Sequence, residues 1–165
     1  MTTLTRHPLL GQTAPDFTLP SADNEGNLTG IRLSDETGKG PVALLFFPLA
    51  FTTVCTAELC MIRDSIKDFE ELSASVFGVS VDSPFAQAAF ARQQRLAFPL
   101  LSDFNRTVSR DYGVLHDQII GLAEISMRAM FIISPEQVVA FASVCDDPAQ
   151  IPDIETGKLM LAQSG

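Results

Sequence analysis

The sequence predicts an α/β domain in which a mixed β-sheet lies between layers of helices. Short apolar runs of strand length alternate with segments whose apolar residues recur every three or four positions, and a four-residue turn separates the last two runs. Strands alternating with helices indicate a parallel sheet, and a hairpin adds antiparallel strands to it. Because the chain has 165 residues, 46% of them hydrophobic, we expect one domain over residues 1–165.

The first half of the chain is typical of two buried strands that flank a long helix. A possible short strand at residues 28–33 lies in a stretch rich in turn formers, and residues 42–47 form an apolar run that suits a central strand covered on both faces. The second buried strand is expected at residues 76–81. Thr52 and Thr53 are plausible caps of the helix between them. Its apolar positions recur at helical spacing and are Leu59, Ile62, Ile66, Phe69 and Leu72.

The second half continues the alternation and ends in a hairpin. Ser83 as a cap and Pro84 at the first helical position open a helix that runs through Arg95. Prolines and a glycine restrict any C-terminal helix to the residues after Asp153. The remaining predicted elements are a short strand at residues 98–101, a helix near residues 105–112, and strands at residues 129–133 and 138–143.

The charge balance argues against several classes of partner. The formal net charge is -9 and the sequence pI is about 4.5, whereas nucleic acids and anionic membranes need clustered Lys and Arg on their partners. No apolar run approaches the roughly 20 residues that span a bilayer. The first eight residues also lack the continuous apolar segment of a signal peptide. We therefore expect a cytoplasmic protein that binds neither nucleic acid nor membrane.

Cys55 occupies a position that favours reactivity. It follows the predicted strand at residues 42–47 and lies in the first turn of the next helix. Unpaired backbone N–H groups and the positive end of the helix dipole favour a thiolate there. The alternative is a small apolar core residue, because most isolated cysteines are structural.

Cys60 lies five residues further along the same predicted helix. In a regular helix it is rotated by about 140° from Cys55 and shares the polar face, so we expect it to be partly exposed. The implied Cα separation of roughly 8 to 9 Å exceeds the limit of about 7 Å for a disulfide without backbone movement. A bond between the two cysteines therefore requires the first helical turn to unwind. An incidental surface cysteine is the alternative.

Cys145 falls at the end of the last predicted strand, beside Asp146 and Asp147. These charges oppose a thiolate, so we expect Cys145 to take no part in the chemistry. A metal site is a weak alternative, because the cysteines and histidines lack C-x2-C or H-x3-H spacing. His7 and His116 are expected to act neither as ligands nor as bases.

The stretch from Pro48 to Cys55 (PLAFTTVC) resembles the active-site motif of the peroxiredoxins, P-x3-[TS]-x2-C. The ten residues that begin at Cys55 (CTAELCMIRD) are similar to the C-T-x-E-x-C-x-x-R-D run of the Q-type peroxiredoxins, also called bacterioferritin comigratory proteins. The preceding PLAFT is similar instead to the alkyl hydroperoxide reductase E type, which lacks a cysteine at the second place. Further similar segments follow the family order, at residues 11–20, 98–103 and 112–114.

The resemblance implies a thioredoxin-like fold, with a mixed central sheet flanked by helices, and a role for each matching residue. Cys55 would be the peroxidatic nucleophile and Cys60 the resolving thiol. Thr52 would hydrogen-bond the sulfur and the peroxide, and Arg128, in the place of the family's second active-site arginine, would offer charged planar donors. Pro48 would shield the site from water. Without the resemblance, Thr52 is interpreted as a cap, Pro48 as a strand end and Arg128 as a surface ion-pair partner.

The function implied is a thiol-dependent peroxidase for hydrogen peroxide and alkyl hydroperoxides, with no metal, flavin or haem. Cys55 would cycle through a sulfenic acid and a disulfide with Cys60, and thioredoxin or a similar dithiol protein would recycle it. Glu58 would bond Arg128 or the helix backbone in a structural role. The protein is expected to be a monomer or a homodimer. The alternatives are a one-cysteine peroxiredoxin resolved by an external thiol, a disulfide oxidoreductase of the same fold, and a peroxide sensor that oxidises a partner.

Overall fold

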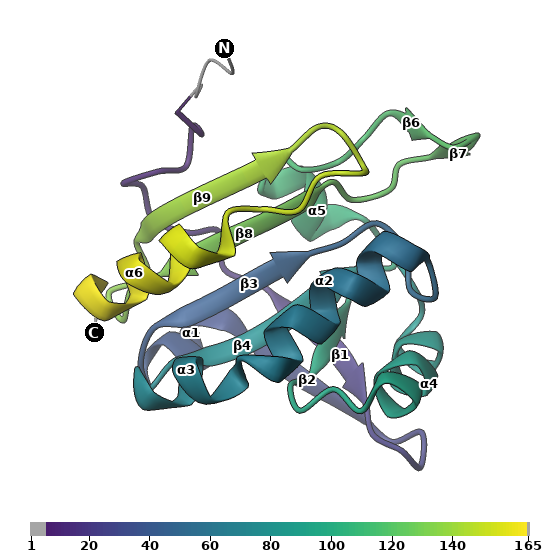
Figure 1. Ribbon diagram of the computed structural model, residues 1–165, viewed down its shortest axis with the longest axis horizontal. Coiled ribbons are helices and arrows are strands. Elements are labelled where there is room, and N and C mark those ends of the chain that lie inside the picture. Colours follow the sequence, from purple (N-terminus) through teal and green to yellow (C-terminus); the bar gives the residue numbers. More distant parts are fainter. Residues whose placement is uncertain (1–5, 165) are drawn as a thin grey trace.

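The structure is a computed structural model that describes residues 6–164 (Figure 1). Residues 1–5 lie outside the described residues, as does residue 165. The N-terminal stretch that supports the expectation of a cytoplasmic protein is therefore described only from residue 6 onward. Within the described part of the chain, none of the helices combines the length and the apolar character needed to cross a membrane.

A five-stranded mixed sheet forms the centre of the fold, with strand order β5-β4-β3-β8-β9 (Figure 1). Neighbouring strands β3, β4 and β5 are parallel, and β8 and β9 add an antiparallel hairpin next to β3. This arrangement confirms the prediction of a mixed sheet. The strands are β3 (Val42–Phe46), β4 (Ser75–Ser80), β5 (Leu100–Ser102), β8 (Arg128–Ile133) and β9 (Val139–Cys145).

Strand β3 lies at the middle of the sheet and is buried along its whole length. Side chains of a strand alternate between the two faces of a sheet. Accordingly, Leu44 and Phe46 belong to one apolar cluster, and Ala43 and Leu45 belong to the cluster on the opposite face. The continuous apolar run in the sequence therefore corresponds to a strand that is covered on both sides.

Helices cover both faces of the sheet. The face toward the viewer in Figure 1 carries α2, α3 and α6, and α1 and α5 lie behind the sheet. Phe90 of α4 joins the same apolar cluster as α2, α3 and α6. The helices are α1 (Leu33–Thr37), α2 (Thr53–Asp64), α3 (Ile66–Glu71), α4 (Pro84–Gln94), α5 (Thr107–Asp111) and α6 (Ile154–Ser164).

The long helix expected after β3 is in fact two helices, α2 and α3, because the helical pattern is interrupted at Ser65. The Ser65 hydroxyl donates to the carbonyl oxygen of Met61 at 2.8 Å, a local bond that competes with the helical pattern. The expected capping by Thr52 is also wrong in detail. Thr52 is the residue before α2, but its hydroxyl donates to the carbonyl oxygen of Leu49 (2.9 Å) instead of accepting from the helix. The start of α4 is as predicted, since the Ser83 hydroxyl accepts from the N–H of Ala86 (3.1 Å).

Several short elements were beyond sequence-based prediction. A hairpin of β1 (Thr18–Ala22) and β2 (Leu28–Arg32) forms a separate two-stranded sheet, and only its second strand was expected. Strands β6 (Gln118–Ile119) and β7 (Leu122–Ala123) are two residues long and carry no detectable period. The C-terminal helix after Asp153 is confirmed.

A glycine explains how α6 packs on the sheet. A Cβ atom at Gly157 would lie 2.6 Å from the sulfur of Met130 in β8, closer than packed atoms approach. Gly157 therefore leaves room for the end of the Met130 side chain against α6, although a glycine lowers helix propensity. The glycine that weakened the helix prediction allows this close packing of α6 on β8.

Candidate active site

The loop between β3 and α2 places Pro48, Thr52 and Cys55 at one end of the sheet. Pro48 is buried directly after the strand, and the Thr52 carbonyl accepts from both the N–H (2.9 Å) and the hydroxyl (2.8 Å) of Thr56. These bonds fix the first turn of α2. Cys55 is the third residue of that helix and is fully buried.

Arg128 reaches the Cys55 sulfur from the first position of β8. Its Nη1 donates to Cys55 Sγ at 2.9 Å and to Glu58 Oε2 at 3.1 Å, and its Nε donates to the carbonyl oxygen of Pro148 at 2.7 Å. Cys55 and Glu58 are fully buried and Arg128 is 4% exposed. A surface role for Arg128 is thus wrong, because register with β3 and β9 holds it inside the molecule.

The surroundings of Cys55 place positive charge next to its sulfur. The guanidinium of Arg128 is a permanent cation that donates directly to the sulfur. The N–H groups in the first turn of α2 add the positive end of the helix dipole. Low-dielectric surroundings strengthen both interactions. A neighbouring cation and a helix N-terminus are features typical of the surroundings of reactive cysteines.

Glu58 shares Arg128 with Cys55 and is strongly affected by its burial. Removal from water raises the pKa of Glu58 to about 7, and the charge and hydrogen bond of Arg128 oppose that rise. Its second oxygen, Oε1, has no hydrogen-bond partner among the described residues. The protonated and ionised forms of the Glu58 carboxyl are therefore similarly populated at neutral pH. The expected contact between Glu58 and Arg128 is confirmed.

A cavity of about 270 Å³ opens beside this cluster. Pro48, Thr52 and Arg128 line it, so the structure brings these three predicted residues around one space. Cys55 is not one of the lining residues, but it contacts Arg128, which is. The other lining residues are largely apolar and are Leu49, Thr53, Val54, Ile119, Ile120, Ile125, Pro148 and Ala149.

The part of this lining that comes from the segment around β6 and β7 was not predicted from the sequence. Ile119 and Ile120 approach the motif residues only through the tertiary fold. The one local signal is their adjacency, two large apolar residues next to a turn, which predicts no particular partner. Ile120 is exposed and adopts a positive φ of 46°, an uncommon conformation for a β-branched residue.

Cys60 and Cys145 have different neighbours, and all three cysteines are free thiols in the described structure. Cys60 is partly exposed, as predicted, and its thiol donates to Oε1 of Gln94 in α4 (3.6 Å). Cys145 is buried at the end of β9, where it pairs in register with Arg128. Burial is the main cause that raises the pKa of Cys145, followed by the charge of Glu58, and the neighbouring aspartates contribute less.

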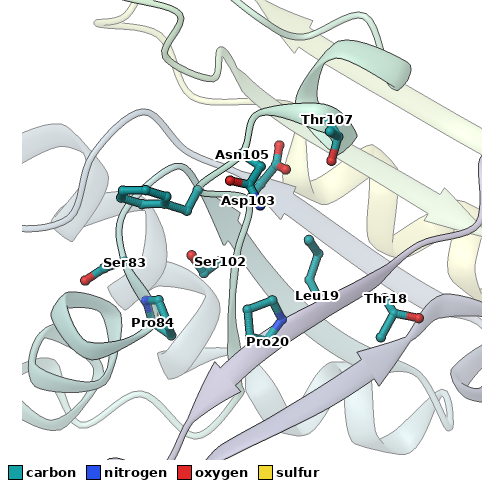
Figure 2. A pocket seen from close by; sticks show the side chains of 10 residues that line it. Thr18, Leu19, Pro20, Ser83, Pro84, Ser102, Asp103, Asn105 and Thr107 are labelled. Atoms are coloured by element: carbon teal, nitrogen blue, oxygen red, sulfur yellow. The ribbon is translucent and has the colours of Figure 1, made fainter.

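A second, larger cavity of about 380 Å³ lies at the carboxyl ends of β4 and β5, with Asp103, Ser102 and Thr107 on its wall (Figure 2). Asp103 is the charged residue of this lining. Its two carboxylate oxygens accept from the backbone N–H groups of Val108 (3.1 Å) and Ser109 (2.7 Å), so they cap α5. Asp103 is thus a satisfied structural group, and the Cys55–Arg128 cluster lies beside the smaller cavity.

The described residues combine a mixed five-stranded sheet with a buried cysteine–arginine pair. The model of the AhpC/TSA family matches residues 10–142, which include Pro48, Thr52, Cys55, Cys60 and Arg128. The chain therefore belongs to the AhpC/TSA family of peroxiredoxins, as its motifs suggested.

Relatives from bacteria and plants are similar over most of this chain. Alkyl hydroperoxide reductase E of Mycobacterium bovis is 36% identical over 146 residues, which are 87% of this chain and 90% of that protein. The chloroplastic 2-Cys peroxiredoxin BAS1 of Spinacia oleracea is 38% identical over 145 residues, 83% of this chain and 52% of that protein. The chain thus spans about half the length of that plant relative.

Solved structures confirm the predicted thioredoxin-like fold of this family. The crystal structure of peroxidoxin BcpB from Mycobacterium tuberculosis is similar with a TM-score of 0.79 and 35% identity. The similarity covers 93% of this chain and 96% of that chain. The similarity includes nearly the whole of both chains, so the mixed sheet and its helices are shared.

Proposed function

We propose that this protein is a thiol-dependent peroxidase that reduces hydrogen peroxide and alkyl hydroperoxides, with Cys55 as the nucleophile. One observation carries the proposal: Nη1 of a buried arginine lies 2.9 Å from the Cys55 sulfur, beside a cavity that Thr52 also lines. Family membership supports it. The pairing supplies both a stabilised nucleophile and a donor for the charge that develops in the reaction.

In the first step, the Cys55 thiolate attacks the hydroxyl oxygen of the peroxide. An S–O bond forms and the O–O bond breaks, so the sulfur loses two electrons and the peroxide gains them. The leaving alkoxide or hydroxide takes up a proton and departs as alcohol or water, and Cys55 becomes a sulfenic acid. Arg128 donates to the sulfur and to the leaving oxygen, Thr52 supplies a hydroxyl, and Pro48 keeps water from the sulfur.

In the second step, the Cys60 thiol attacks the Cys55 sulfur and displaces water, and a disulfide forms. The two residues lie in one regular helix, so this step requires α2 to unwind from its first turn. A dithiol protein of the thioredoxin type then reduces the disulfide. We place this cycle in the cytoplasm, in a monomer or a homodimer.

The orientation of Cys60 favours one competing mechanism. Its thiol points to Gln94 of α4 and is partly exposed, so an external thiol that reduces the Cys55 sulfenic acid is the second candidate. Mass spectrometry after one equivalent of peroxide tests both. The proposal predicts a loss of two hydrogens in the wild type and no oxidation at residue 55 in Cys55→Ser. Unchanged wild-type mass, with all thiols still free, would contradict peroxidase function.

A further inference from the structure

Asp82, which follows β4, holds the loop that carries the predicted site residues. Its Oδ2 accepts a hydrogen bond from the backbone N–H of Ala50 at 2.8 Å. Ala50 lies midway between Pro48 and Thr52. The carboxylate of Asp82 is therefore a tertiary anchor for the loop, from a residue that is 32 positions away in the sequence.

The anchor is itself fixed by a buried polar network. The Ser80 hydroxyl donates to the same Oδ2 of Asp82 at 2.7 Å, and Nε2 of Gln87 donates to the Ser80 oxygen at 2.9 Å. The Ser102 hydroxyl donates to the carbonyl oxygen of Asp82 at 2.6 Å. Ser80, Gln87 and Ser102 are all buried. Because these partners belong to β4, α4 and β5, the Asp82 carboxylate has one well-defined position relative to the sheet.

The residue after Ala50 shows that the loop is under strain. Phe51 has a φ of 67°, in the left-handed region that an aromatic residue rarely adopts, and it is 53% exposed. Such a conformation persists when the surrounding structure fixes it. Two contacts do so here, the Ala50–Asp82 hydrogen bond and the edge-on packing of the Phe51 ring on Phe90 at 5.2 Å between centroids.

We propose that Asp82 is a positioning residue that controls both halves of the thiol cycle. The bond from Ala50 to Asp82 holds Thr52 and the start of α2 in the form in which Cys55 meets peroxide. The same bond must break when the first turn unwinds and Cys55 moves toward Cys60. This inference rests on the proposed function, since it assigns a structural control to the same site.

Loss of the anchor has opposite effects on the two steps. Attack on peroxide slows, because Thr52 and Cys55 are no longer held in one geometry. Disulfide formation becomes faster, because the strained loop no longer has to break a charge-assisted hydrogen bond before it opens. A general loss of stability could also ease opening, so the test needs a control variant that removes hydrogen bonds away from the loop.

The test compares Asp82→Asn with the wild-type protein. Asn keeps the size of the side chain but removes the charge that strengthens the bond to Ala50. Quenched-flow alkylation with mass spectrometry would give the rate of Cys55 oxidation by hydrogen peroxide and the rate at which the sulfenic acid becomes a disulfide. We expect the first rate to fall and the second to rise, each by about tenfold, the scale of a change near 1.4 kcal/mol in a barrier.

Asp103→Asn is the matched control. Asp103, like Asp82, accepts two hydrogen bonds, although Asp103 is buried and Asp82 is partly buried; its partners cap α5 and do not belong to the loop. Both rates should stay within about twofold of the wild type in this variant. Ser80→Ala provides a milder variant, because it removes one donor from the Asp82 carboxylate and leaves Ala50 in place. It should move both rates in the same directions as Asp82→Asn, by less.

The outcomes separate the inference from the proposed function. If wild-type Cys55 is not oxidised by peroxide, the proposed function fails and the inference fails with it. If Cys55 is oxidised and both Asp82→Asn and Ser80→Ala match the wild type, or lower both rates together, the inference alone is overturned. A sulfenic acid that never becomes a Cys55–Cys60 disulfide in any variant would overturn the part that concerns opening.

Discussion

The arginine and the cysteine of the site come from parts of the molecule with different mechanical support. All six residues of β8 are buried, and the strand pairs with β3 on one side and β9 on the other. In α2, four of twelve residues are buried, a strained loop precedes the helix and a break at Ser65 follows it. The cation is therefore fixed by the sheet, whereas the thiol is carried by a segment with fewer constraints.

This difference suits a reaction in which one partner must move. Local stability is lowest where few apolar contacts and strained backbone coincide. The first turn of α2 meets this description, and the position of Arg128 does not. We infer that α2 opens to allow the disulfide while Arg128 stays in place, ready to receive the thiolate when the helix forms again.

The largest expected effect is the loss of the nucleophile. Cys55→Ser should abolish peroxidase activity and leave the fold intact, because a hydroxyl of similar size supplies no anion at neutral pH. Turnover of hydrogen peroxide with a dithiol protein, together with circular dichroism, provides the check. Activity within a few fold of the wild type would remove Cys55 from its proposed role.

Glu58 lies in α2 and bonds Arg128 of β8, so it joins the two parts of the site. Because burial raises its pKa, the free energy of unfolding should depend on its protonation. Its pKa is raised from an ordinary 4.5 to about 7 by burial. Between these values the unfolded state releases a proton that the folded state retains, so the free energy of unfolding falls as pH rises, by about 3 kcal/mol across the window. Glu58→Gln should lack this contribution. Urea unfolding at pH 5 and pH 8 measures the difference, and parallel pH profiles for both proteins would contradict the assignment.

Removal of the fixed cation should slow the first step. Arg128→Met keeps an apolar stem of similar length but deletes the donor to the Cys55 sulfur. We expect the second-order rate of Cys55 oxidation to fall by about 10²-fold, the scale of losing one preorganised donor. Arg110→Met, at an exposed ion pair with Glu124, is the control. A rate that hardly changes in Arg128→Met would mean that the arginine only packs against the thiol.

The other two cysteines should have little effect on the first step and unequal effects on the second. Cys60→Ser should oxidise at a near-normal rate and then accumulate a Cys55 sulfenic acid, which a sulfenic-acid-specific nucleophile would label. Cys145→Ser should change little, because burial and the nearby Glu58 charge raise the pKa of Cys145 and keep its thiol protonated. If sulfenic acid accumulated in Cys145→Ser and not in Cys60→Ser, Cys145 would be the resolving thiol and Cys60 would take no part.

The same comparison explains how much could be predicted from the sequence. Strand β3 was predictable because a central strand is apolar throughout, and α4 because a serine cap and a proline mark its start. The break at Ser65 was not, since the apolar period continues from Ile62 to Ile66 across it. Ser65 has a φ of -108° and a ψ of 17°, a local departure from helical backbone that the apolar pattern does not record.

The site divides in a similar way. Pro48, Thr52 and Cys55 lie within eight residues, so one local motif names them together. Asp82 and Ile120 contribute through contacts that only the assembled fold creates, since Asp82 follows β4, the strand that pairs with β3. Asp82 is an ordinary residue type in a loop, and the uncommon positive φ of Ile120 is a feature of the folded backbone that the sequence does not record. No local pattern therefore distinguishes them from ordinary loop residues.

Peptide-level hydrogen exchange with non-reducing mass spectrometry tests the central claim most directly. The reduced protein is compared with protein treated with one equivalent of peroxide. We expect a Cys55–Cys60 disulfide, faster exchange in the first turns of α2, and unchanged protection in β8, where Arg128 lies. A Cys55–Cys145 disulfide, or faster exchange in β8 with α2 still protected, would contradict the account in which the thiol moves and the cation stays.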